Sequence, residues 1–187
     1  MKRVKNHAGF IALMAMALSG LVLADDDGDE RGFMPPWGVN VRPGVAPVNF
    51  ALYQNECGAC HMAYQPGLLP ALSWERIMAG LDNHFGENAE LAPQERNAIL
   101  GYLLNNAAGR SNYRVSNKLM RNVRGVPLRI SELPYFVHEH REIPARLVRG
   151  NPKVRSFSNC DACHTGAVRG SYNEHQIHIP GYGRYDD

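Results

Sequence analysis

The chain has 187 residues, of which 44% are hydrophobic, with 20 lysines and arginines against 18 aspartates and glutamates. Its 18 glycines and 12 prolines are somewhat above average usage but below the level that indicates disorder. This composition excludes a collagen-like or low-complexity chain and argues against a large sheet, and the length corresponds to one domain or two very small ones.

The N-terminal segment 1–24 has the pattern of a secretory signal peptide. Three basic residues among the first five precede an apolar run over residues 8–23, and Ala24 places a small residue before the expected cleavage site. The alternative is an uncleaved membrane anchor, but this run of 16 residues is shorter than the roughly 20 that a spanning helix needs. We therefore expect cleavage after segment 1–24, and a mature chain outside the cytoplasm with no membrane insertion.

The mature chain is predicted to have two halves of opposite charge. Residues 25–109 carry 4 basic and 11 acidic side chains, whereas residues 110–187 carry 13 basic and 7 acidic ones. Such a dipole suits oriented docking on a charged partner, because its field steers the encounter; an ordinary solvated surface is the alternative. The basic half resembles a nucleic-acid patch in composition, but export argues against nucleic acid as a partner. Residues 25–49 are acidic and then proline-rich, which predicts an extended, locally mobile segment.

All four cysteines fall in two C-x-x-C-H motifs, at residues 57–61 and 160–164. In c-type haem attachment each thiol adds to one vinyl group of the porphyrin, and the following histidine binds the iron. Residues i and i+3 share one face of a helical turn, so both sulfurs can reach the same ring edge. Asn159 is placed to cap the turn of the second motif.

Three other interpretations of these motifs fit less well. Paired zinc knuckles usually lie about 15–20 residues apart, whereas 99 residues separate Cys60 from Cys160. Two disulfides would suit an exported chain but would not explain a histidine after each pair. A thioredoxin-like motif expects a βαβ pattern, and none is visible. The sequence therefore predicts two covalently bound haem c groups. Their attachment residues would be Cys57, Cys60, Cys160 and Cys163, with His61 and His164 as the first axial ligands.

The second axial ligand of each iron decides the function, because histidine gives a low-potential carrier, methionine raises the potential, and an open site permits ligand binding or catalysis. Residues 73–85 predict a helix capped by Ser73. Its apolar face would comprise Trp74, Ile77, Met78, Leu81 and His84 or Phe85. His84, at the end of this face, is the candidate ligand of the first haem. A core or capping histidine is the alternative for His84, and Met78 on the same face is interpreted as packing beside the ring.

The next predicted helix begins at Pro93 and continues through Leu104 to an end near Gly109. Residues 105–130, rich in Asn, Arg and Gly, are expected to connect the two halves of the molecule.

Residues 131–141 predict a further helix, with Ser131 as its cap and Pro134 in its first turn. One face would carry Leu133, Phe136, Val137 and His140. His140 is therefore the candidate ligand of the second haem, and His138, which lies off that face, is expected to point to solvent. His175 and His178, in the polar glycine-rich tail, remain possible replacements for His140.

The position of the second motif constrains the architecture. Only 23 residues follow His164, too few for a haem-cradling helical domain with its own downstream ligand, so the second ligand should come from upstream. The predicted fold is mainly α, with two small unequal haem-binding lobes and much irregular loop, and with the haems forming much of the core. The expected lobes are an N-terminal haem c domain at 50–110 and a C-terminal one at 111–187.

Four stretches resemble the periplasmic dihaem cytochromes c of proteobacteria. They are residues 57–70 (CGACHMAYQPGLLP), 74–86 (WERIMAGLDNHFG), 140–146 (HREIPAR) and 159–167 (NCDACHTGA). The resemblance implies a small bis-histidine electron carrier of the periplasm, with His61/His84 and His164/His140 as axial pairs. It also implies redox partners such as an oxygen-binding monohaem cytochrome c and a membrane cytochrome b.

These observations favour a dihaem c-type cytochrome that transfers one electron at a time between redox partners and is not an enzyme. The first alternative is a haem enzyme or gas-binding protein with one open axial site, such as a peroxidase. The second is a fixed subunit of a larger electron-transfer complex, which the charge asymmetry permits without requiring it.

Overall fold

The computed structural model describes residues 42–185. The expected signal peptide at 1–24 and most of the expected extended segment, residues 25–41, lie outside the described residues. Within 42–185, none of the helices has both the length and the apolar character that crossing a membrane requires.

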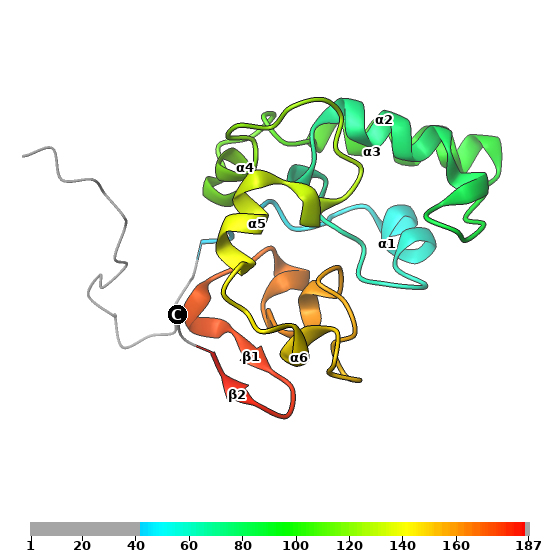
Figure 1. The fold of residues 1–187 in the computed structure, drawn as a ribbon. Coiled ribbons are helices and arrows are strands. Elements are labelled where there is room, and N and C mark those ends of the chain that lie inside the picture. Colours follow the sequence, from blue (N-terminus) through cyan, green and yellow to red (C-terminus); the bar gives the residue numbers. More distant parts are fainter. Residues whose placement is uncertain (1–41, 186–187) are drawn as a thin grey trace, which may run out of the picture. The chain divides into compact units, whose positions relative to one another are not determined.

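Short helices separated by loops make up most of this part of the chain, which confirms the mainly α fold (Figure 1). The α-helices are α1 (Ala51–Cys57), α2 (Ala71–Ala79), α3 (Pro93–Asn106), α4 (Arg114–Leu119), α5 (Pro134–His140) and α6 (Ala145–Val148). The strands β1 (His178–Ile179) and β2 (Gly183–Arg184) form one small antiparallel hairpin. Single 3₁₀ turns occupy Pro66–Leu68, Leu81–Asn83, Ile130–Glu132, Cys160–Ala162, Ala167–Arg169 and Glu174–Gln176.

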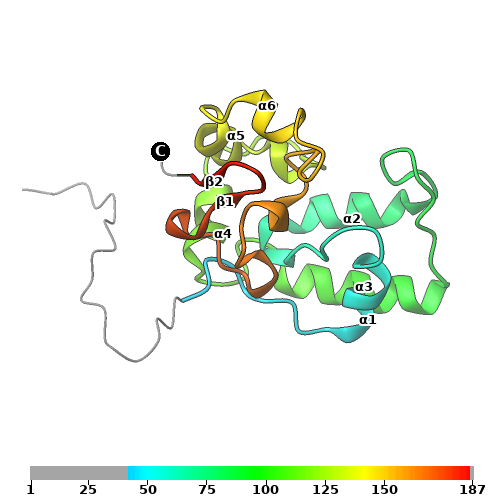
Figure 2. The same ribbon diagram turned by 90° about the horizontal axis from the view of Figure 1, so that it is seen from below.

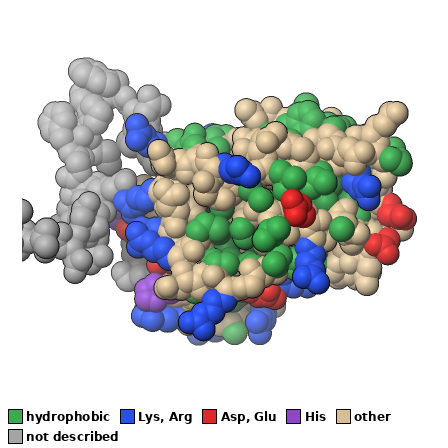
Figure 3. Space-filling view, turned by 90° about the horizontal axis from the view of Figure 1, so that it is seen from above, with side chains coloured by type: hydrophobic (Ala, Val, Ile, Leu, Met, Phe, Trp, Pro, Cys, Tyr) green, Lys and Arg blue, Asp and Glu red, His purple; other side chains and the backbone are tan. Residues whose placement is uncertain are grey.

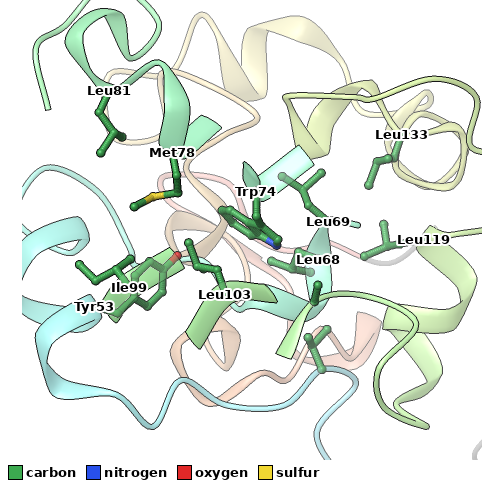
Figure 4. Packing of buried hydrophobic residues seen from close by; sticks show 12 residues of the cluster. Tyr53, Leu68, Leu69, Trp74, Met78, Leu81, Ile99, Leu103, Leu119 and Leu133 are labelled. Atoms are coloured by element: carbon green, nitrogen blue, oxygen red, sulfur yellow. The ribbon is translucent and has the colours of Figure 1, made fainter. Parts of the chain in front are cut away.

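The main hydrophobic core lies around α2 and α3, which run side by side in both views (Figures 1 and 2). Trp74 and Met78 of α2 and Ile99 and Leu103 of α3 are at most 5% exposed, and their side chains lie close together (Figure 4). Tyr53 of α1 completes this contact region. Burying such a side chain contributes roughly 1.5–3 kcal/mol, so this helix pair anchors the residues that follow the first C-x-x-C-H motif.

A second, smaller apolar cluster lies near the C-terminus and is formed by Val148, Val154 and Ile179. The larger cluster extends to Leu119 and Leu133. The two clusters are unequal in size, and the expected division of the chain between residues 110 and 111 stays a prediction.

The predicted helix at 73–85 is shorter than expected and begins earlier. Helix α2 starts directly after Pro70 and ends at Ala79, so Ser73 lies inside it, fully buried, and not at its cap. The ring of Pro70 fixes its backbone φ angle directly before the first turn of α2. Gly80 ends the helix, because a residue without a side chain adopts non-helical backbone angles easily. His84 therefore lies in a separate turn beyond α2.

Helix α3 confirms the predicted start at Pro93 and ends at Asn106, three residues before Gly109. The expected connector at 105–130 contains the short helix α4. This helix has only six residues, too few to show a helical pattern of apolar residues in the sequence.

Helix α5 confirms Pro134 in the first turn, but Ser131 lies in a preceding 3₁₀ turn and is not the cap. Leu133 is fully buried and His138 is exposed, as expected. Val137 is 52% exposed, so its place on the buried face was predicted wrongly. With only seven residues, α5 buries a narrower stripe than the full helical face that the periodicity suggested.

Residues 42–49 have no helix or strand, but they are held in place. Val45 is fully buried, and the backbone N–H groups of Gly44 and Val45 both donate to the carbonyl of Gly170, at 2.9 and 3.1 Å. Gly170 has a φ of 76°, and a Cβ there would lie 2.2 Å from the carbonyl oxygen of Val45, so this close approach requires glycine. Residues 44 and 45 are thus hydrogen-bonded to the loop that follows the second C-x-x-C-H motif.

Candidate functional site

The first C-x-x-C-H motif begins at the last residue of α1. Cys57 ends that helix, Cys60 is exposed in the following turn, and neither sulfur forms a disulfide. Burial, with a smaller effect of Glu56, raises the pKa of the Cys57 thiol to about 11. His61 Nδ1 lies 2.8 Å from the carbonyl oxygen of Met62. Since a carbonyl only accepts, Nδ1 carries the proton and the lone pair of Nε2 is available for a metal.

His84 faces His61 from the turn after α2. The two ring centres are 6.3 Å apart and their planes differ by 24°. The turn is closed by paired backbone hydrogen bonds between His84 and Glu87, of 2.7 and 3.2 Å, and by a positive φ of 57° at Phe85. Burial lowers the pKa of His84, and His61 and Arg129 lower it further, which favours the neutral, metal-binding ring.

The second C-x-x-C-H motif forms a 3₁₀ turn over Cys160–Ala162. Asn159 precedes the turn, but its side-chain amide donates to Val154 and does not cap. Burial first, and then Asp161, raise the pKa of the Cys160 thiol to about 12, and burial raises that of Cys163.

The environment of His164 is more enclosed than that of His61. Burial, together with His140, lowers the pKa of His164 to about 4. Its Nδ1 atom is buried and has no hydrogen-bond partner among the described residues. The ring is therefore neutral, and it is oriented by packing and by the backbone of the motif.

His140, the last residue of α5, faces His164 with 6.0 Å between ring centres and 66° between ring planes. Its Nδ1–H donates to the Phe136 carbonyl at 2.9 Å. Because this bond uses Nδ1, Nε2 is the nitrogen that would bind a metal. The Phe136 ring stacks on His140 at 3.9 Å and 8°, and Phe157 meets it edge-on at 5.8 Å. These contacts fix the orientation of the His140 ring.

The other candidate ligands lie elsewhere. His138, His175 and His178 are exposed, and Arg141 donates to His138 Nδ1 at 3.2 Å. Met78 is 4% exposed and packs in the core between α2 and α3, which agrees with its predicted role as a packing residue.

Two tyrosines that sequence analysis did not single out contact the paired histidines. Tyr64 stacks on His61, with 4.7 Å between ring centres, and Tyr172 contacts His164 at 5.4 Å. Tyr64 lies only three residues after His61, so proximity in sequence was a usable signal. Tyr172 lies eight residues after its histidine, in a tail with no periodic pattern, and offered none.

The two histidine pairs fit the geometry of a metal ion held between imidazoles. A metal–imidazole bond is about 2 Å long, and each ring centre lies about 1 Å behind its nitrogen, which gives about 6 Å between centres. The observed separations are 6.3 and 6.0 Å. Within residues 42–185, no three His, Cys, Asp or Glu side chains come together as a bare metal site, so the zinc alternative lacks its ligand set.

The chain matches known dihaem cytochromes over most of the described residues. The family model "Dihaem cytochrome c" matches residues 53–172, more than half of the chain. A dihaem cytochrome c from Shewanella baltica is 44% identical, with a TM-score of 0.61, covering 73% of this chain and 97% of that one. One from Rhodobacter sphaeroides is 48% identical, with a TM-score of 0.60, covering 68% and 100%. No curated protein matches the chain. This protein, with its two covalently bound haem c groups, therefore belongs to the dihaem cytochrome c family.

Proposed function

We propose that this protein is a one-electron carrier of the periplasm and not an enzyme. The observation that carries the proposal is the pairing of His61 with His84 and of His164 with His140, at separations that suit one iron between each pair. If each histidine pair binds one iron, neither haem would have an open position for a substrate or gas.

Each motif and its partner histidine would hold one haem. Cys57 and Cys60 would form the thioethers of the first haem, and Cys160 and Cys163 those of the second. The iron ligands would be His61 and His84 at the first site, and His164 and His140 at the second. The bound haems supply one-electron Fe(III)/Fe(II) chemistry, and the protein contributes orientation, burial and hydrogen bonds to the ligands.

The surroundings of the ligands suit a carrier because they restrict ligand movement. The hydrogen bond from His61 to Met62 and that from His140 to Phe136 each fix one tautomer and one ring direction. Ligands held in this way need little rearrangement when the iron changes oxidation state, and they are not readily displaced.

Export and partners complete the proposal. Segment 1–24 would direct the chain to the periplasm, where haem c attachment and electron exchange would occur. Basic side chains are numerous along the left and lower edges of the face seen in Figure 3, and acidic ones lie at its right end and also among the basic ones. The excess of basic side chains in residues 110–187 and of acidic ones in residues 25–109 suits oriented docking. We propose redox proteins as partners, such as an oxygen-binding monohaem cytochrome c and a membrane cytochrome b.

A carbon monoxide difference spectrum of the reduced protein, recorded with the spin state of the oxidised protein, tests this function. The expected result is no carbon monoxide binding and fully low-spin iron at both haems. Stoichiometric binding to one haem would contradict the carrier function and would point to a haem enzyme or a gas-binding protein.

A further inference from the structure

Two consecutive residues, Tyr64 and Gln65, connect the first haem motif to the second. They follow His61 by three and four residues, and each hydrogen-bonds to a residue about 100 positions away. Their partners lie on both sides of the second motif, at Ser158 before Cys160 and at Ala167 after His164.

Tyr64 makes the most direct of these connections. One face of its ring stacks on His61, at 4.7 Å and 24°. Its hydroxyl donates to the carbonyl of Ser158 at 2.5 Å, and the Cys160 thiol lies 3.7 Å from the same carbonyl oxygen. A single side chain thus reaches from an imidazole of the first site to the backbone two residues before a haem-attachment cysteine of the second.

Gln65 and Tyr172 make a second, longer connection. Gln65 is fully buried, and its amide nitrogen donates to the carbonyl of Ala167 at 2.6 Å. The Tyr172 hydroxyl donates to the Gln65 side-chain oxygen at 2.6 Å, and the Tyr172 ring meets His164 at 64° with 5.4 Å between centres. This route needs two side chains and ends in an inclined ring contact, so it should couple the sites more weakly than Tyr64 does.

We propose that Tyr64 is the residue that couples the two haems electronically, through its ring contact with His61 and its hydrogen bond to Ser158. This inference rests on the proposed function, because it requires both haems to exchange electrons. In the exchange one iron loses one electron and the other gains it. Tyr64 keeps its proton and its oxidation state, and the first electron comes from an external reductant.

The test is the rate of electron exchange between the haems of the intact protein, started by a flash-generated flavin semiquinone. Tyr64→Phe keeps the ring on His61 and removes only the hydrogen bond to Ser158, so a severalfold loss of rate is expected. Tyr172→Phe, which removes the hydroxyl of the longer route, is expected to have a smaller effect. Tyr102→Phe is the control, since the Tyr102 hydroxyl accepts from Asn49 and its ring packs on Phe50 and Tyr53.

Reduction potentials and electron paramagnetic resonance (EPR) spectra of each variant separate electronic coupling from a structural role. Tyr64→Phe should leave both unchanged while the rate falls. An unchanged rate in Tyr64→Phe, or equal losses in Tyr64→Phe and Tyr172→Phe, would overturn the assignment while the carrier function stands. Absence of any exchange in the unmodified protein would overturn both.

Should Tyr64→Phe fail to retain its haems, 3-fluorotyrosine placed at position 64 keeps the ring and strengthens the hydroxyl as a donor. A higher exchange rate would support the assignment, and an unchanged rate would overturn it.

Discussion

The two haem sites have the same motif and the same pair of residue types, yet their surroundings differ. At the first site the histidine planes differ by 24° and His61 is exposed; at the second they differ by 66° and His164 has a buried Nδ1 without a partner among the described residues. The two motifs are alike in attachment chemistry, so we expect the residues packed around each motif to make the electronic properties of the two haems differ.

This difference leads us to expect unequal reduction potentials. A buried site disfavours the more highly charged ferric state, and a ligand without a hydrogen bond at Nδ1 donates less charge to the iron. Both effects raise the potential of the second haem relative to the first. The second haem should then be reduced first, and electrons should leave the first haem for the second.

Removal of a proposed axial ligand should have the largest effect on this comparison. His140→Ala should convert the second haem to a high-spin form that binds carbon monoxide, because it removes the imidazole that faces His164. The first haem should remain low-spin. His138→Ala, two residues away on the same helix, is the matched control and should change neither spectrum. If His138→Ala opens a haem and His140→Ala does not, the pairing is wrong.

Core substitutions should affect stability more in the larger cluster than in the smaller one. Leu103→Ala in α3 removes a side chain that is 1% exposed and should lower the free energy of unfolding by about 2–5 kcal/mol. Val154→Ala in the small cluster removes fewer methyl groups and should lower it less. Guanidinium unfolding of the haem-containing protein provides the measurement. Leu72→Ala, at a position 61% exposed, is the control, and a larger loss for Val154→Ala would contradict the ranking.

Loosening the His140 ring should change the second site and leave the first unchanged. Phe136→Leu removes the ring stacked on His140, so the angle between the His140 and His164 planes should become less well defined. The EPR spectrum of the second haem should broaden and shift, whereas that of the first should not change. Phe50→Leu, which alters an aromatic contact with Tyr102, serves as the control. An unaltered second-haem spectrum in Phe136→Leu would show that stacking does not set the ring angle.

The smallest expected effect concerns a surface charge near the first site. The Arg129 guanidinium lies 4.0 Å from the centre of the Phe85 ring, which meets His84 edge-on. Because a nearby positive charge favours the reduced iron, Arg129→Gln should lower the potential of the first haem and widen the gap to the second. The shift should shrink at high salt, since Arg129 is partly exposed. An equal shift in Arg121→Gln would indicate only a change in net charge.

The histidines that the sequence proposes as ligands lie in facing pairs, whereas the elements that carry them differ from the predicted ones. Helical periodicity favours His140 over His138, and the structure brings His140 opposite His164 and leaves His138 exposed. His84 lies opposite His61 although the helix expected to present it ends at Ala79. The apolar spacing indicated the burial of this segment, but the Gly80 break and the positive φ at Phe85 depend on tertiary contacts.

Contacts between distant segments could not be predicted from one sequence. The bonds from Tyr64 to Ser158 and from Gly44 to Gly170 join residues 94 and 126 positions apart, and neither has a local pattern that identifies its partner. The β1–β2 hairpin was missed for a related reason, because two-residue strands are too short to show alternation.

An EPR-monitored redox titration of the intact protein tests the central claim most directly. That claim is that the two haems, each with the proposed pair of histidine ligands, are unequal. Nearly perpendicular imidazole planes give a ferric spectrum dominated by one feature at large g, whereas nearly parallel planes give a rhombic spectrum. We expect both signals, with the large-g signal lost first as the potential is lowered. Two identical signals, or earlier loss of the rhombic one, would contradict it.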